Sequence, residues 1–192
     1  MKAPNGKATK LTPKQWVQVR TKAFKKWFGD WELTFAKNYL LNEKPVALLT
    51  GKEFTKIDGK TLTDQVYECF ISIGGKAVSS IFGEVILDKG GADNSLAHGI
   101  GRQKAIAYAS VKEVIENGVL IDYDVNHKGR GYDSAVIVAP IEISKKRYVC
   151  CVVITRKEDN RFYLHEVTPI EKLQDAVFVT NSSQSPSAHL GD

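Results

Sequence analysis

The stretch SAVIVAPIEISKKRYVCCVVITRKEDNRFYLHEV, residues 134–167, decides the fold class. It contains three runs rich in β-branched and aromatic residues: Ser134–Ile143, Arg147–Thr155 and Arg161–Val167. Only two short polar links separate these runs, Ser144–Lys146 and Arg156–Asn160. Links of this length join neighbouring antiparallel strands. The stretch therefore predicts a meander of three strands.

The segments on either side extend this prediction. Residues 102–117 carry apolar side chains at positions 107, 108, 111, 114 and 115, which fall on one helical face, and Gly118 is a natural helix end. Val119–Val125 predicts a strand before the meander, and Ala176–Thr180 predicts an edge strand after it. The chain is therefore expected to be α+β, with N-terminal helices followed by a helix packed on a twisted antiparallel sheet.

The N-terminal part predicts helices that carry many basic residues. Thr12-Pro13, followed by Trp16, Val19, Ala23 and Trp27, is typical of a capped amphipathic helix, and Trp31, Phe35 and Leu40 continue the apolar stripe. Short β-like runs follow at Val46–Leu49, Val66–Ile73 and Ile81–Leu87. We expect a basic helical extension over residues 1–45, an α+β domain over 46–180 and a loose, Ser-rich tail over 181–192.

Composition narrows the class of protein. Hydrophobic residues make up 43% and charged residues 26%, which is ordinary for a soluble domain with its own core. No apolar run approaches the roughly 20 residues of a membrane span, and no signal peptide is visible, so we expect no span and a cytoplasmic location. The cytosol of a target cell, reached by delivery within a larger protein, is one such location. The chain has an odd number of cysteines, Cys69, Cys150 and Cys151, which predicts buried thiols rather than disulfides.

The net charge is +5, and residues 1–40 hold nine Lys and Arg against two acidic residues. Such a segment attracts polyanions. A helix face that is simply exposed to solvent would explain the many basic residues at least as well.

The strand Arg161–Val167 carries the clearest chemical pattern. Alternation places Arg161, Tyr163 and His165 on one face and the apolar Phe162 and Leu164 on the other. Imidazole moves protons near neutral pH, guanidinium holds phosphate, and a phenol stacks on a base or donates to a phosphoryl oxygen. An ordinary solvent-facing strand is the equally weighted alternative.

A second cluster precedes the predicted helix of residues 102–117. His98 stands beside Gly99, and Gly99 and Gly101 flank Ile100 in a tight segment. Lys104 falls on the core-facing stripe of the helix, where a lysine either snorkels or reaches into a site. With His165, these residues supply the parts for a general base, a general acid and a cation beside the phosphate.

Three further positions are weaker candidates. Ser134 starts a strand after a Gly-rich turn and is expected either to bind phosphate or to end that turn. His127, between Asn126 and Lys128, is expected to be a surface residue or an RNA contact together with Lys128 and Arg130. Asp122 and Asp124 share a strand face but make no metal motif, so neither a metal nor another cofactor is expected.

Four segments together resemble a known group of nuclease domains: Ile81–Asp88, His98-Gly99 with Lys104, Asp133-Ser134 and Phe162–Val167. They resemble the barnase–EndoU–colicin–RelE type nuclease domains of phage polyvalent proteins and bacterial polymorphic (contact-dependent inhibition) toxins, over about residues 77–170. Separately, Val19-Arg20-Thr21 with residues 27–32 is similar to a junction segment of such mobile-element proteins. The resemblance implies a helix on a twisted sheet, metal-independent endoribonuclease activity, tRNA as a frequent target and, in toxins, a cognate immunity protein.

The leading hypothesis is a metal-independent ribonuclease that cleaves tRNA or other structured RNA and leaves a 2′,3′-cyclic phosphate and a 5′-hydroxyl. His98 and His165 are its expected acid–base pair, with Lys104 as the third catalytic residue. The residues expected to bind substrate are Arg161, Tyr163, Ser134 and Arg102.

Two alternatives stay open. One is an ADP-ribosyltransferase-like effector built on His98, Tyr163 and Glu166, although strand alternation turns Glu166 away from His165. The other is a non-catalytic nucleic-acid-binding phage accessory module.

Overall fold

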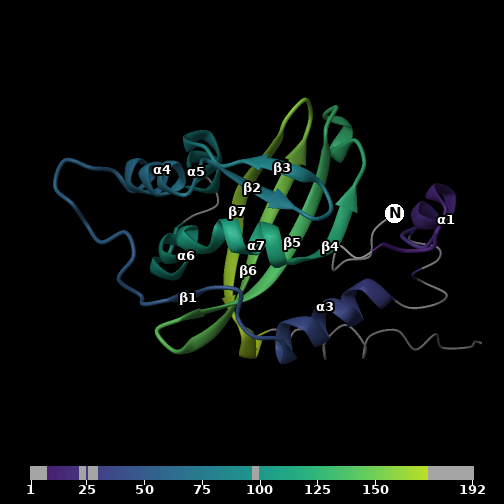
Figure 1. The fold of residues 1–192 in the computed structure, drawn as a ribbon, viewed down its shortest axis with the longest axis horizontal. Coiled ribbons are helices and arrows are strands. Elements are labelled where there is room, and N and C mark those ends of the chain that lie inside the picture. The colour runs from purple at the N-terminus through teal and green to yellow at the C-terminus, as the bar shows by residue number, and fades with distance from the viewer. Residues whose placement is uncertain (1–7, 22–24, 26–29, 97–99, 173–192) are drawn as a thin grey trace, which may run out of the picture.

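The computed structural model describes residues 8–21, 25, 30–96 and 100–172. Figure 1 shows a curled sheet with helices on both faces. The helices are α1 (Pro13–Gln18), α3 (Trp31–Asn42), α4 (Leu62–Ser72), α5 (Lys89–Leu96), α6 (Arg102–Ala107) and α7 (Val111–Asn117), with 3-10 turns η1 (Tyr108–Ser110) and η2 (His127–Gly129). The strands are β1 (Leu48–Leu49), β2 (Lys76–Ser79), β3 (Gly83–Ile86), β4 (Val119–Asp124), β5 (Asp133–Ile143), β6 (Lys146–Arg156) and β7 (Asn160–Pro169). The α+β class is thus confirmed.

The meander predicted from residues 134–167 forms the centre of the sheet. Strand β5 pairs antiparallel with β6 from Asp133 to Ile143, and β6 pairs antiparallel with β7. The turn between β5 and β6 is tight, and both Ser144 and Lys145 have positive φ angles. The strand predicted before the meander is present as β4, which pairs antiparallel with β5.

The complete sheet is mixed rather than purely antiparallel. Its order is β1-β5-β6-β7-β3-β2, with β4 also on β5, and the pairs β1–β5 and β3–β7 are parallel. Both parallel pairs are short. The hydrophobic pattern of β1 and β3 shows that they are strands but does not fix the direction of their partners, so the expected antiparallel sheet is wrong at these two edges.

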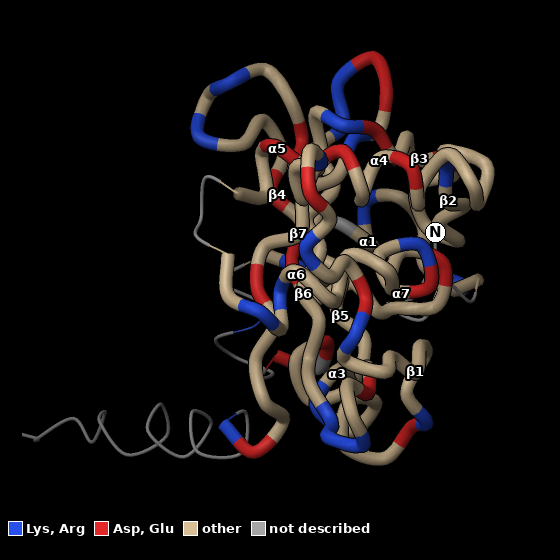
Figure 2. Tube along the Cα trace, turned by 90° about the vertical axis from the view of Figure 1, so that its left-hand side faces the viewer, with Lys and Arg blue, Asp and Glu red and all other residues tan. Residues whose placement is uncertain are grey.

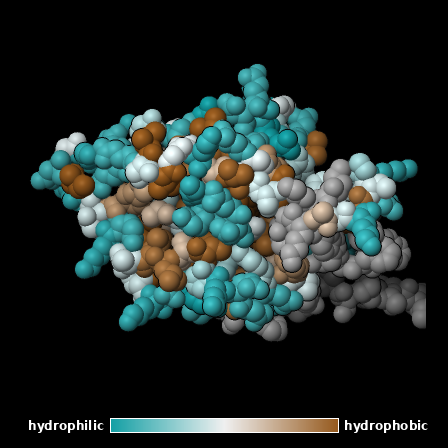
Figure 3. Space-filling view, viewed as in Figure 1, coloured by the Kyte–Doolittle hydropathy of each residue, from teal (hydrophilic) through white to brown (hydrophobic). Residues whose placement is uncertain are grey.

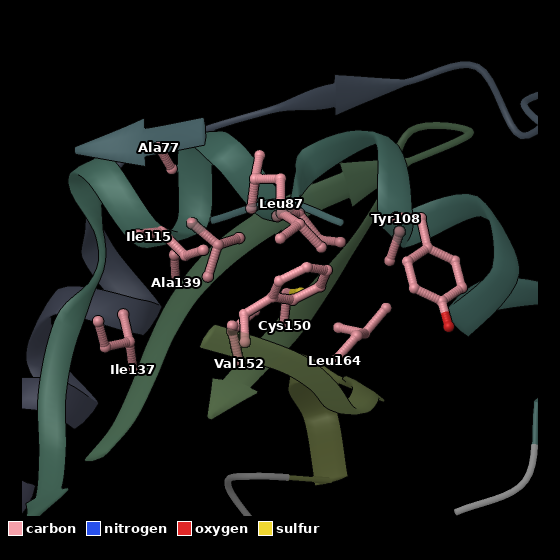
Figure 4. Packing of buried hydrophobic residues seen from close by; sticks show 14 of the residues in the cluster. Ala77, Leu87, Tyr108, Ile115, Ile137, Ala139, Cys150, Val152 and Leu164 are labelled. Atoms are coloured by element: carbon pink, nitrogen blue, oxygen red, sulfur yellow. The ribbon is translucent and has the colours of Figure 1, made fainter. Parts of the chain in front are cut away.

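The main core lies between one face of the sheet and the helices α4–α7. The five apolar positions predicted between 107 and 115 are all buried in it, and a 3-10 turn divides the predicted helix into α6 and α7. Figure 4 shows Leu87, Tyr108 and Ile115 packed over Cys150, Val152 and Leu164 of the meander. Cys150 therefore fills core space, as predicted.

Helix α3 covers part of the opposite face of the sheet. Ala36 and Leu40 pack on Val119, Val138 and Val149 in a second apolar cluster. Since the helix lies at the lower end of the sheet in Figure 1, the upper end of this face is not covered by it. Part of the candidate site lies at that open end.

The β-like run predicted over Val66–Ile73 is wrong, because these residues belong to helix α4. Thr61 and Asp64 form a reciprocal capping box that starts the helix, and Val66 and Phe70, four residues apart, are both buried. Tyr67 and Ile71 remain exposed on the outer side. A short run of apolar residues is compatible with a strand or a helix, and here the capping box favours the helix.

Two predictions concern the ends of the chain. The first helix begins at Pro13 as predicted. Ala23, Trp27, the expected strand Ala176–Thr180 and the tail 181–192 lie outside the described residues. No helix within the described ranges has the length and hydrophobicity needed to cross a bilayer.

Candidate active site in a groove beside strand β7

A groove of about 750 Å³ opens at the end of the sheet where β6 turns into β7. The loop between β4 and β5 and the turn between β6 and β7 both rise at this end in Figure 1. These two segments and the first turns of α5 supply the walls. The lining residues are Asp88, Gly90, Gly91, Asn94, His127, Lys128, Arg130, Tyr132, Thr155, Lys157, Asp159, Arg161, Phe162 and Tyr163.

The register of the strands shows on which face of the sheet Thr155 and Arg161 of the lining lie. Thr155 pairs with Arg161 on one side and with Ser134 on the other, and Ser134 pairs with Asp124. Paired residues share a face, so these four side chains form one row across four strands. Their neighbours Ile154 and Phe162 lie in the main core, which places the row on the opposite face.

His127 is held by a carboxylate at the wall of the groove. Its Nδ1 lies 2.8 Å from Oδ2 of Asp124, and its ring packs on Tyr132 with centroids 5.9 Å apart at 30°. The imidazole side chain is 25% exposed. A carboxylate on one ring nitrogen fixes the orientation and the tautomer of the ring and leaves Nε2 for other partners.

The loop that carries His127 is built from its own hydrogen bonds. Asp133 accepts from the backbone N–H of Asn126 at 3.0 Å and from the hydroxyl of Tyr123 at 2.7 Å. Asn126 in turn accepts from Gly131 N–H, and His127 N–H donates to the carbonyl of Tyr132. Asn126 and Lys128 both have positive φ angles, which these bonds hold in place.

The groove carries an excess of positive charge. Arg161 pairs with Asp88 and Asp159, so both carboxylates of the lining are used on one guanidinium. Among the described residues, no carboxylate pairs with Lys128, Arg130 or Lys157. Figure 2 shows Lys and Arg in both loops at this end of the molecule. An anionic ligand is therefore favoured here.

Two of the predicted site residues meet in the groove. Arg161 and Tyr163 share a face of β7, as strand alternation requires, and both line the groove. Burial, then Cys151 and then Tyr132, raise the pKa of the Tyr163 phenol. The phenol thus stays protonated at neutral pH and can donate a hydrogen bond or a proton.

His165 stands at a bulge just beyond the groove. The β6–β7 register jumps from Cys151–Glu166 to Val152–Leu164, so His165 is the extra residue of the strand. Its ring meets Tyr163 edge-on, with centroids 6.1 Å apart. It does not line the groove.

The bulge also changes the face of the residues that follow it. Glu166 now pairs with Cys151 and lies on the Tyr163 face, while Val167 packs against the main core. The expected alternation through Val167, which turned Glu166 away, is therefore wrong beyond Leu164. An extra residue in a strand is not visible in the hydrophobic pattern.

Lys104 lies on the core-facing stripe, as predicted, but not in the groove. It is 7% exposed, and its Nζ donates to the carbonyl of Ser95 at 2.7 Å. Burial lowers the pKa of its ammonium, and Glu166 opposes this shift. The lysine therefore ties α6 to the end of α5.

The remaining predicted residues either do not line the groove or lie outside the described residues. Ser134 is buried in β5, in the row of Thr155 and Arg161. Arg102 donates to the carbonyls of Gly51 and Phe54 and holds the loop after β1. His98 lies outside the described residues.

The Asp124–His127 pair is the feature that sequence reasoning missed. The signal was an aspartate three residues before a histidine in a loop rich in Gly, Lys and Arg. Spacing within a loop does not show which side chains meet, because that depends on the positive φ angles at Asn126 and Lys128. Within the described ranges, no group of three or more His, Cys, Asp or Glu side chains is arranged to hold a metal ion.

Exposed large apolar side chains are scattered among the described residues, for example Leu48, Ile71, Val78 and Val125. On the face in Figure 3 they form small patches separated by hydrophilic residues. Small apolar patches of this kind are common on protein surfaces.

Residues 58–164, more than half of the chain, match the family model of large polyvalent protein-associated domain 3. The chain belongs to this family. The family match covers every residue that lines the groove and ends at Leu164, one residue before the bulge. Membership in large polyvalent protein-associated domain 3 associates the chain with phage polyvalent proteins. No match was found among curated proteins or among solved structures.

Proposed function

We propose that this domain cleaves RNA in the groove beside β7 by metal-independent acid–base chemistry. The observation that carries the proposal is the Asp124–His127 pair, which faces a groove shared with Tyr163 and an excess of cations. An oriented imidazole beside a phosphate-binding surface is what transphosphorylation needs. The resemblance to nuclease domains of polyvalent proteins supports the same activity.

Each step of the proposed reaction has a residue in the groove. Nε2 of His127 accepts the proton of the ribose 2′-hydroxyl, and the 2′-oxygen forms a bond to phosphorus. The bond from phosphorus to the 5′-oxygen breaks, and the Tyr163 phenol, which its raised pKa keeps protonated, supplies the proton to that oxygen. The products are a 2′,3′-cyclic phosphate and a 5′-hydroxyl. Lys128, Arg130 and Lys157 offset the charge that gathers on the phosphorane.

This assignment moves the acid–base role from His165 to His127. His165 contacts Tyr163 edge-on and is assigned to the path of the RNA rather than to proton transfer. The proposed steps do not use His98, which lies outside the described residues. Delivery as a toxin and a cognate immunity protein also stay predictions of the resemblance, as does tRNA as the target.

The test compares the three histidines in one assay. Purified protein is incubated with labelled tRNA in excess chelator, and the ends of the products are analysed. We expect His127→Ala to slow cleavage by about 10²- to 10⁴-fold and Asp124→Asn by less, because general acid–base catalysis contributes about that much. His165→Ala should lower the cleavage rate by no more than about tenfold.

Two outcomes would contradict the proposal. If His127→Ala cleaves at the parent rate while His98→Ala and His165→Ala lose activity, the acid–base pair is His98 and His165, as the sequence predicts. If the parent protein cleaves no RNA, the ribonuclease proposal is wrong and the groove is at most a binding site.

The bulge at His165 favours a second candidate function, an ADP-ribosyltransferase-like reaction, because it brings Glu166 to the face of Tyr163. Neither His165 nor Glu166 lines the groove, which makes this the weaker candidate. Release of nicotinamide from NAD by the parent, lost in Glu166→Gln, would establish it in place of RNA cleavage.

A further inference from the structure

Four ring side chains follow one another from the β4–β5 loop to the bulge of β7. His127 packs on Tyr132, and Tyr163 meets His165 edge-on. Tyr132 and Tyr163 both line the groove, and Tyr132 is among the groups that raise the pKa of Tyr163, after burial and Cys151. We call this set the aromatic row: His127, Tyr132, Tyr163 and His165.

Cationic side chains accompany the aromatic row. Lys128 and Arg130 come from the same loop as His127 and Tyr132, and Lys157 comes from the turn before Tyr163. The loops that carry them stand at the same end of the sheet in Figure 2. Rings interleaved with cations are the pattern of surfaces that bind single-stranded nucleic acid, because bases stack on the rings while phosphates meet the cations.

We propose that the groove accepts an unpaired segment of RNA and excludes a double helix. This inference rests on the proposed function and adds the class of substrate to it. In an A-form duplex the base faces are stacked on one another and cannot reach side-chain rings. A groove of about 750 Å³ is also of the size that holds small ligands, so it fits bases that have left the helix but not the helix itself.

The proposal assigns a path and a role to each ring. One base stacks on Tyr132 and the next on Tyr163, while the phosphates follow Lys128, Arg130 and Lys157. His165 marks the end where the strand leaves the groove. In a structured RNA, the segments able to follow this path are loops and single-stranded ends.

The experiment measures binding without cleavage. A fluorescent 2′-O-methyl oligoribonucleotide lacks the attacking hydroxyl and therefore cannot be cut, and its affinity for the full chain is measured by anisotropy. We expect the unpaired strand to bind at least tenfold more tightly than the same strand annealed to its complement. Tyr132→Ala should weaken binding of the unpaired strand by about 5- to 150-fold, the range for loss of one base–aromatic stack.

Two further variants control the experiment. Tyr67→Ala removes an exposed tyrosine on α4, outside the groove, and should bind as the parent does. Tyr163→Phe keeps the ring and removes the phenol, so it should retain binding within about twofold while it slows cleavage of an unmodified strand. This variant separates the stacking role of Tyr163 from its proposed role in proton transfer.

The results distinguish the two proposals. Equal affinity for strand and duplex, or unchanged affinity in Tyr132→Ala, overturns the single-strand inference even if the parent cleaves RNA. Preferential binding of the unpaired strand without cleavage of its unmodified form overturns the ribonuclease proposal and leaves this inference standing. Far-UV circular dichroism of each variant checks that a loss of binding is not a loss of fold.

Discussion

Asp133 fixes the shape of the loop that carries His127. Its carboxylate accepts hydrogen bonds from the Tyr123 hydroxyl and the Asn126 N–H, and these two bonds hold its pKa below the ordinary value of 3.8. A carboxyl with a lowered pKa in the folded state stabilises the fold above its ordinary pKa, and this stabilisation disappears as the pH falls through the folded value. The Asp133 carboxylate should therefore stabilise the fold at neutral pH but not in strong acid.

We predict that Asp133→Asn lowers the free energy of unfolding by about 1.5–3 kcal/mol at pH 7, the size expected for a hydrogen bond to a charged group. The difference from the parent should stay constant above about pH 5 and shrink below pH 4, as measured by urea unfolding across this range. Asp122→Asn, which removes a carboxylate for which the described structure shows no hydrogen bond, is the control. A difference that grows on acidification would contradict this origin.

At the same scale, side chains on regular strands were predictable and side chains in loops were not. Arg161 and Tyr163 face the groove because alternation along a strand is fixed by backbone geometry. His127 could not be predicted to face Asp124, because its direction depends on a loop with left-handed residues. The direction of His165 depends on a bulge that leaves no trace in the pattern of apolar residues.

At the scale of elements, α5 is the part that the sequence did not reveal. Its composition, KGGADNSL, is poor in apolar residues, yet it lies against the edge of β7. Ser95 donates to the Gly91 carbonyl and accepts from Leu164 N–H, and the Tyr108 hydroxyl donates to the Ala92 carbonyl. The helix is thus attached by polar bonds and close backbone approach, which hydrophobic periodicity cannot detect.

The close approach of α5 to β7 depends on Gly91. A Cβ at this position would lie 2.4 Å from the Phe162 ring and 2.8 Å from the Phe162 carbonyl oxygen, both too near for a real contact. We predict that Gly91→Ala lowers the free energy of unfolding by about 1–3 kcal/mol, the usual cost of overpacking, in urea or thermal unfolding.

Gly90→Ala is the matched control for that prediction. The nearest atom to its added Cβ is a side-chain oxygen of Asp88 at 3.6 Å, an ordinary contact. Alanine also favours the helix over glycine, so this variant should be neutral or more stable by up to about 1 kcal/mol. Equal destabilisation by both variants would show that a general sensitivity of α5, rather than the Phe162 contact, is responsible.

At the scale of the whole molecule, the cations of the groove come from a different part of the chain than the basic N-terminal segment. Residues 1–40 hold nine Lys and Arg against two acidic residues, but the cations that line the groove come from residues 128–161. Arg161 lies at the start of β7, and Lys128, Arg130 and Lys157 lie on two loops that the strand order of the sheet brings to one end. Net charge predicted an attraction to polyanions, whereas the place of that attraction depends on long-range strand pairing.

The salt dependence of RNA binding tests this placement. Each phosphate contact on a single strand contributes about 0.7 to the slope of log affinity against log salt concentration. Replacing Lys128, Arg130 and Lys157 with alanine should therefore reduce the magnitude of the slope by about 2. The affinity itself should fall by at least about tenfold at low salt. The control replaces Lys52, Lys145 and Lys146, exposed lysines outside the groove, and so removes the same net charge. If both triple variants lose affinity and slope equally, the RNA responds to the overall charge of +5 and not to the groove.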